Sequence, residues 1–313
     1  MRGSMKSTRS LFLKLILILS IVHPFEVFSQ GCSDAGFCSI GGLSAQKKDS
    51  SYRKHNFTFS IPIGEGDESV LVVTPSLQYD LTLSEAWTTQ LKVTGNYAEG
   101  TLGKASGAGD VYLSGIYAFT TRNKIRLSFT LGSKFPLNSA NLTSEGRPLP
   151  MQYQSSLGTT DVIAGITAVM NAWQFSAGWQ QPLSGANNNK FLPASWNVPE
   201  AQRYPSSNQL ARTSDILMRV SYSFLDRKKL YVSGGLLGIY HPVKDTYVDL
   251  SSTRSPINGS EGLTLNLTTA FAWWVKEDLK FGFNAGVPVA VRAVRPDGLT
   301  RSFVFAPEIR WSF

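Results

Sequence analysis

Histidine is the side chain that most often exchanges protons near neutral pH, so the histidines of this chain are the first candidates for chemistry. The chain has three of them, and His23 falls in a segment that we expect to be removed, which leaves His55 and His241. Acid–base and nucleophilic catalysis need a base within hydrogen-bond reach of its partner. Two isolated histidines do not indicate such a pair, so we predict no catalytic residue.

The two cysteines are the next reactive side chains. Cys32 and Cys38 lie six positions apart, downstream of what looks like an export signal. An oxidising compartment favours a disulfide between them. Two thiolates cannot fill the tetrahedral shell of a zinc ion, and His55 is distant in the sequence. We therefore predict a disulfide, no metal site and no cofactor.

Residues 1–29 have the features of an export signal. Basic residues precede the apolar run 11–22, and the segment ends at the small residue Ser29. A membrane-spanning helix needs about 20 apolar residues, and this run is shorter. We expect a signal peptide cleaved after Ser29, with a lipoprotein cleaved before Cys32 as the alternative. The polar segment 30–54 that follows is expected to be a periplasmic tail or a plug.

The rest of the chain alternates between apolar and polar residues, and a period of two is typical of strands. No later segment has the run of apolar residues that a helical span needs, so insertion into a membrane would have to use strands. The clearest case is the C-terminal segment, where apolar residues alternate with polar ones from Phe303 to Phe313. We predict strands at 55–63, 70–83, 87–99, 107–120, 124–137, 158–170, 173–183, 212–225, 229–242, 262–275, 279–289 and 301–313.

The connections between these segments alternate in length. Short ones fall after every second strand, whereas the others include long loops at 138–157, 184–211 and 243–261. In an up-and-down barrel, alternate connections lie at opposite ends, so all short turns share one rim; outer-membrane barrels have this asymmetry. Aromatic residues expected near the short turns resemble an interfacial girdle. They are Tyr117, Phe119, Tyr222, Phe224, Trp273, Trp311 and Phe313.

The predicted fold is therefore all-β: a transmembrane antiparallel up-and-down β-barrel of about 12 strands over residues 55–313. A soluble barrel with long loops is the alternative, because soluble sheets alternate too. We expect the barrel in the outer membrane of a Gram-negative-type bacterium, with outer-membrane lipids around it. The formal net charge of +8 is spread without a basic cluster, so nucleic acid is not an expected partner.

Three strands open with small or polar residues followed by an aspartate, which places Asp110, Asp161 and Asp215 on the polar face near the long loops. Charged residues on the same face of other strands would join them inside the barrel. Rings of charge can set solute selectivity, but the same charges can also pair with one another and stiffen a narrow barrel. Both interpretations stay open. The other candidates for the lumen are Lys134, Arg219, Glu308 and Arg310, with Lys92 and Lys280 beside them.

Three short elements resemble the outer-membrane proteins of the MetA-pathway-of-phenol-degradation type: Gly107–Asp110, Lys134–Leu137 and Trp311–Phe313. More remotely, the chain resembles the barrels that pass fatty acids and aromatic hydrocarbons. The resemblance implies passive passage of small solutes, apolar ones among them. The terminal Phe313 is similar to the signal by which such barrels engage the outer-membrane assembly machinery.

We predict a channel for small solutes. The alternative is a non-transporting barrel that binds a ligand or partner through its long loops. The least favoured function is a lipid-modifying enzyme, because a barrel of this size resembles outer-membrane phospholipase. Such an enzyme would need a lipid-facing histidine, and the glycine-rich stretch 233–238 leaves the facing of His241 open.

Overall fold

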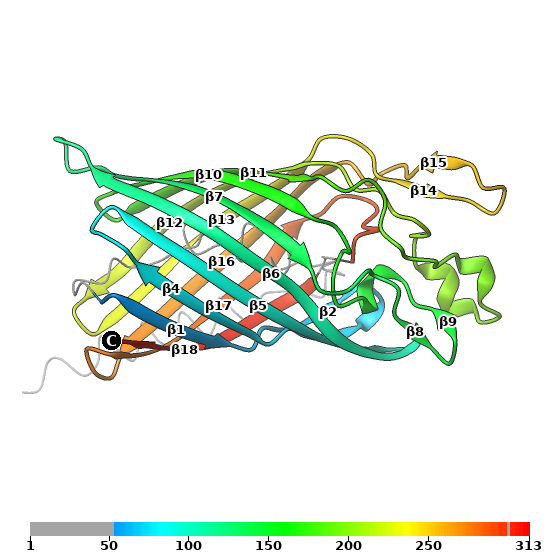
Figure 1. The fold of residues 1–313 in the computed structure, drawn as a ribbon, viewed down its shortest axis with the longest axis horizontal. Helices are drawn as coiled ribbons and strands as arrows, with labels where there is room; N and C mark the ends of the chain where they lie inside the picture. The colour runs from blue at the N-terminus through cyan, green and yellow to red at the C-terminus, as the bar shows by residue number, and fades with distance from the viewer. Residues whose placement is uncertain (1–52, 299–300) are drawn as a thin grey trace, which may run out of the picture.

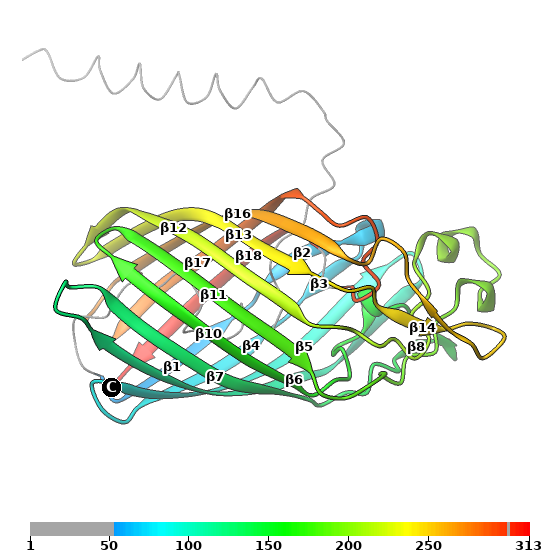
Figure 2. The ribbon, with the colours of Figure 1, turned by 90° about the horizontal axis from the view of Figure 1, so that it is seen from above.

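Each segment predicted as a strand forms one in the computed structural model, which describes residues 53–298 and 301–313. The strands make a closed antiparallel barrel of 12 strands, with the long loops gathered at one end (Figures 1 and 2). The expected signal peptide, Cys32 and Cys38 lie outside the described residues, as does nearly all of the segment 30–54. The disulfide therefore stays a prediction.

The first two barrel strands are each divided into two pieces. The first consists of β1 (His55–Ser60) and β2 (Ile63–Gly66), and the second of β3 (Leu71–Val73) and β4 (Ser76–Thr82). Pro62 and Pro75 lie at the breaks, where they lack the N–H that a sheet ladder needs. The other strands are β5 (Trp87–Gly100), β6 (Gly103–Thr120), β7 (Arg126–Pro136), β10 (Asp161–Met170), β11 (Trp173–Pro182), β12 (Asp215–Arg227), β13 (Leu230–His241), β16 (Gly262–Trp274), β17 (Leu279–Ala290) and β18 (Arg301–Ser312).

The barrel closes between its first and last strands. β18 pairs antiparallel with β17 on one side and with β1 and β2 on the other, with Phe57 opposite Trp311. Phe313 lies against His55, with ring centroids 5.3 Å apart, at the rim that carries the short turns (Figure 1). A role of this residue in assembly stays a prediction.

The outer face of the barrel is apolar. In β12, Met218 and Val220 are exposed, while Leu217 and Arg219, which alternate with them along the strand, are buried. Successive side chains of a strand point to opposite faces, so the same alternation in every strand gives the whole barrel an apolar outside and a mostly polar inside. The predicted girdle residues all lie on the outside and near the short turns. Examples of exposed apolar residues around the wall are Phe59, Leu91, Leu113, Leu131, Phe175, Leu236, Leu267, Phe281 and Phe305.

An apolar wall around the full circumference has no protein partner and suits lipid. Closed barrels satisfy every backbone hydrogen bond within the sheet, which is the condition for spanning a membrane with strands. The chain is therefore a transmembrane barrel of the outer-membrane kind. In the described residues no helix has the length and apolar character required to cross a bilayer.

One strand is longer than the sequence pattern predicted. β6 begins at Gly103 rather than at residue 107, and it joins β5 through the turn Thr101–Leu102, so this hairpin extends past the rest of the wall. The extension was missed because its inward side chains are small and show little alternation. It is covered by loop residues: Leu102 and Ala98 belong to an apolar core with Tyr153 and Phe191.

The long loops pack into a cap over one mouth of the barrel. Two buried asparagines of the loop 183–214 hold it to its neighbour: Asn187 donates to the carbonyl of Leu157 at 3.0 Å, and Asn189 donates to that of Ala140 at 2.9 Å. The elements of the cap are η2 (Asp67–Ser69), β8 (Thr143–Ser144), β9 (Arg147–Pro148), η3 (Met151–Tyr153), η4 (Pro193–Ser195), η5 (Pro199–Arg203), β14 (Thr246–Val248) and β15 (Arg254–Pro256).

Candidate functional site

The residues predicted to face the lumen lie on the inner face of the wall. Asp161, Lys134 and Asp215 are almost fully buried, at 0, 1 and 3% exposure, and Asp110 and Arg219 are buried at 8% each. Glu308 and Arg310 are half-buried inner residues of β18. Their role in solute selection remains a prediction.

Lys134 and Asp161 form a buried ion pair. The two residues face each other across β7 and β10, with Nζ and Oδ2 3.0 Å apart. Thr159 donates to the other carboxylate oxygen at 2.7 Å, and the Gln180 amide also donates to Asp161. Removing one member of such a pair leaves an uncompensated buried charge, which costs about 3–5 kcal/mol. This pair therefore fits the stiffening interpretation.

Nearer the short turns, lumen charges also meet in pairs. Lys280 Nζ lies 2.8 Å from Glu308 on the neighbouring strand, and Arg310 lies 3.9 Å from Asp80. Gln90 donates to Asp80 at 2.8 Å. These contacts cross-link neighbouring strands on the inner face. They do not fill the lumen at this level, because the inward Asn284 beside Glu308 is exposed.

At the long-loop mouth, six charged or titratable side chains form what we call the rim cluster. They are Arg212, Asp215, His241, Asp245, Arg292 and Asp297. His241 lies at its centre, with Nδ1 2.7 Å from Asp215 and Nε2 2.9 Å from Asp245. Arg212 bridges Asp215 at 2.6 Å and Asp297 at 3.1 Å, and Arg292 also pairs with Asp297.

The rim cluster joins three loops to the wall. Asp215 and His241 lie at the ends of β12 and β13, and the other members come from the loop 183–214 and the segments 242–261 and 291–298. Burial alone would raise the pKa of Asp297, but the guanidinium groups of Arg292 and Arg212 hold that pKa below its ordinary value. Burial likewise opposes the charge of Arg212, yet Asp215 and Asp297 raise its pKa above the usual range. Both groups therefore stay ionised inside the cap.

Of the rim cluster, sequence reasoning identified only Asp215 as a lumen residue. Arg212 is the first residue of the predicted strand 212–225, and Asp245, Arg292 and Asp297 lie in polar loops, where charges are expected to be solvated. Their burial depends on loops meeting one another. The only local signal was the Asp that opens β12.

His241 faces inward. Its two ring nitrogens contact carboxylates, and the residue is only 1% exposed. A lipid-modifying enzyme built on His241 would need this side chain on the lipid side, and the structure does not place it there.

The cap narrows the lumen through the segment 149–157, which we call the inward loop. Every residue of the inward loop is buried. It is fastened to the inner wall: Ser156 donates to Asp110 Oδ1 at 2.6 Å, and Asn96 donates to the carbonyl of Gln154 at 3.1 Å. Asp110 therefore holds a loop, which is the outcome expected when a strand-end aspartate satisfies polar groups near a rim.

Glycines in the Gly107–Asp110 element make room for the inward loop. A Cβ on Gly107 would lie 2.9 Å from Ser155 Oγ, and one on Gly109 would lie 3.0 Å from the Ser155 carbonyl oxygen. The loop can thus lie directly on the backbone of β6. This contact is the physical reason for the small residues that sequence analysis noticed as a motif.

The segment 291–298 presses on the inward loop from the other side. Gly298 has φ +66°, and a Cβ there would lie 2.5 Å from the backbone nitrogen of Gln152. Arg295 in the same segment is paired with Asp67 at 2.7 Å and accepts a hydrogen bond from Gln152 through its carbonyl at 3.4 Å. The rim cluster therefore positions the inward loop through Asp297 and Gly298.

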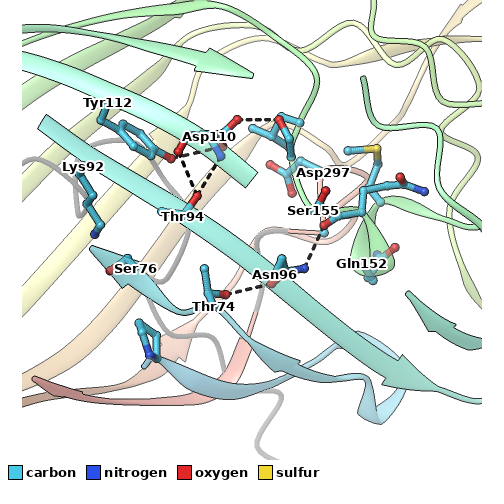
Figure 3. Close-up of a pocket in the computed structure, with 16 residues that line it drawn as sticks. Thr74, Ser76, Lys92, Thr94, Asn96, Asp110, Tyr112, Gln152, Ser155 and Asp297 are labelled. Atoms are coloured by element: carbon cyan, nitrogen blue, oxygen red, sulfur yellow. Dashed lines mark hydrogen bonds between the residues drawn. The ribbon is translucent and has the colours of Figure 1, made fainter. Parts of the chain in front are cut away.

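A cavity of about 40 Å³ lies between the inward loop and the inner faces of β4, β5 and β6 (Figure 3). That volume holds on the order of three water molecules. Its labelled lining is polar and comes from strands, the inward loop and the segment 291–298: Thr74, Ser76, Lys92, Thr94, Asn96, Asp110, Tyr112, Gln152, Ser155 and Asp297.

Part of the lumen beside this cavity is apolar. Tyr112, Ile163, Leu217 and Leu237 form a buried cluster that links β6, β10, β12 and β13 from the inside. The alternation in the sequence predicted a polar inner face, so this apolar cluster inside the barrel was not expected. Its signal was present in β12, where Leu217 falls between the inward residues Asp215 and Arg219.

The chain matches no family model and no curated protein sequence. The predicted membership of the MetA-pathway type is therefore not confirmed. Among solved structures, the KdgM porin is similar at 7% identity and a TM-score of 0.43, over 82% of this chain and 99% of that one. The NanC porin is similar at 9% identity and 0.43, over 82% and 98%. The CymD monoaromatic hydrocarbon channel is similar at 7% identity and 0.45, over 92% and 99%. These likenesses are too remote to indicate a function.

Proposed function

We propose that this protein is an outer-membrane channel for small solutes, narrowed at its long-loop mouth by the inward loop. The observation that supports the proposal most directly is the combination of an apolar outside with a charged and polar inside that still contains a cavity below the cap. A barrel that served only as an anchor could fill its interior with apolar side chains. Polar lumens are typical of barrels that conduct.

The lining also bears on the kind of solute. Most residues that line the cavity carry hydroxyl, amide or charged groups, with Pro62, Met151 and Leu157 as apolar members. This majority supports hydrophilic solutes in place of the apolar ones that the family resemblance implies. The apolar cluster around Ile163 and Leu217 lies beside the cavity and does not form its lining, apart from Tyr112. We therefore assign the channel to small hydrophilic molecules.

Conductance of the purified full chain in planar bilayers tests this function. We expect discrete, reproducible opening steps that grow when the inward loop is shortened by replacing residues 151–156 with two glycines. The matched control replaces residues 194–202 of the outer cap, which leaves the inward loop in place. Complete absence of current in both the wild type and the shortened variant would contradict the channel.

A second function, binding of a surface ligand by the cap without transport, is favoured by one observation. The hairpin of β14 and β15 projects from the rest of the cap (Figure 1), and Leu250 at its tip is 76% exposed. If the inward-loop variant carries no current, this function becomes the better interpretation. Loss of cell-surface binding on changing Leu250→Ser would then support it.

A further inference from the structure

We propose that the cavity under the inward loop binds the hydroxyl groups of a small uncharged polyol, with Gln152 and Ser155 as the residues that contact it. This inference rests on the proposed function and names the class of solute that the channel takes. Glycerol is the smallest probe of that class. The cavity lies open enough toward the lumen for a longer polyol to extend out of it.

Two buried polar atoms point to an occupant. The Gln152 residue is 2% exposed and Ser155 is 9% exposed, yet Gln152 Oε1 and Ser155 Oγ have no hydrogen-bond partner among the described residues. Both residues line the cavity (Figure 3). A buried polar atom without a partner carries its full desolvation cost, so a molecule in the cavity is expected to supply the missing hydrogen bonds.

The chemistry of these two atoms selects the occupant. An amide oxygen such as Gln152 Oε1 only accepts, whereas a serine hydroxyl donates and accepts. An alcohol group can donate to the first and accept from the second. A three-carbon polyol is larger than the roughly three waters that the cavity holds, so only some of its hydroxyl groups occupy the cavity and the rest extend toward the lumen. Thr74, Ser76 and Thr94 add further hydroxyls to the lining.

Charge in the lining argues against an ionic ligand. Asp110 already accepts a hydrogen bond from Ser156, and Asp297 is paired with Arg292 and Arg212. An anion would lie beside these two carboxylates, and a cation would lie beside Lys92 while the carboxylates are engaged elsewhere. An uncharged ligand avoids both penalties.

Binding is tested by saturation-transfer NMR on the full chain in lipid nanodiscs, with glycerol as the probe. We expect a saturable glycerol signal that Gln152→Met weakens about fivefold, because the near-isosteric side chain removes the hydrogen bond to the ligand, along with the long one to the Arg295 carbonyl. Ser155→Ala should weaken it by a similar factor and deletes a single atom, so it guards against misfolding of the first variant. Gln202→Met is the matched control, because Gln202 lies exposed on the outer cap.

The uncharged requirement is tested in the same samples. Glycerate carries a carboxylate in place of one CH2OH group, and serinol carries an ammonium in place of the central hydroxyl. Each should give at most a tenth of the glycerol signal. Equal signals from either ion, no saturable signal from glycerol, or a signal that neither cavity variant changes would each overturn the inference.

Liposome swelling with glycerol separates this inference from the channel itself. Saturable binding without swelling would retain the polyol site and overturn the proposed function. Swelling without saturable binding would retain the channel and overturn the polyol site. When both hold, Gln152→Met should raise the glycerol concentration at which the flux is half-saturated, whereas Gln202→Met should leave both that concentration and the single-channel conductance of salt unchanged.

Discussion

The wall of the barrel and the cap over its mouth are stabilised in different ways. In the wall, successive side chains point alternately to lipid and to the lumen. Apolar side chains such as Leu131 and Met218 are 65% exposed because they face the lipid. In the cap, the rim cluster buries six charged or titratable side chains from separate segments. A single substitution is therefore expected to destabilise the cap more than it destabilises the wall.

The largest expected effect is in the rim cluster. Asp297→Ala removes the shared partner of Arg212 and Arg292 and so takes one negative charge out of a buried network of charges. Breaking such a network costs about 3–5 kcal/mol. We expect the cap to open locally while the wall stays folded, which hydrogen exchange of the segment 291–298 would measure. Glu85→Ala, in an exposed short turn, is the control and should change nothing.

The comparison predicts a smaller effect for a charge on the outer wall. Leu131 lies in the middle of β7, and Leu131→Arg would place a cation at the level of the hydrocarbon core, at a cost of about 2–4 kcal/mol. Leu183→Arg is the matched control, because Leu183 is 64% exposed but follows the end of β11 at the rim. Its cost should be at most about 1 kcal/mol. Equal losses of folding stability in lipid vesicles would contradict a membrane-embedded wall.

A change at Gly298 tests how the segment 291–298 supports the inward loop. Gly298→Ala adds a Cβ in a left-handed conformation and against the backbone of Gln152, so we expect a loss of about 1–3 kcal/mol and a larger pore conductance. Gly146→Ala is the control, because Gly146 also has a positive φ but has no neighbouring atom within 4 Å of the new Cβ. If both variants conduct alike, the contact with the inward loop has no role in narrowing the mouth.

The smallest effect is expected from mild acid. The pKa of Asp297 is lower in the folded protein than in the unfolded chain, so its stabilisation is complete above about pH 4 and declines as the pH falls below that value. We expect the protection of the segment 291–298 against hydrogen exchange to fall between about pH 4 and pH 3. In Asp297→Asn the protection that remains should not fall over this pH range. If it still falls, another titrating group is responsible.

The sequence by itself determined the wall. Strand number, facing and the asymmetry of turns and loops all follow from a side-chain period of two, which is a local property, and the hydrocarbon solvent outside makes that period nearly uninterrupted from residue 55 onward. By the same alternation Asp110, Lys134 and Asp161 are expected to point inward, and all three are buried in the structure. The Gly107–Asp110 motif was also visible in the sequence, but the sequence did not show that its glycines make room for the inward loop.

The tertiary structure alone decided the cap. Arg295 meets Asp67 from the opposite end of the chain, and Gly298 meets Gln152. Such contacts produce no periodic pattern in the sequence, because the position of a loop depends on the segments it packs against and not on a repeat of its own residues. Whether a polar loop residue is solvated or buried therefore depends on which loops share the mouth. Closure of the barrel, by bringing its first and last strands together, is what brings those loops to the same place.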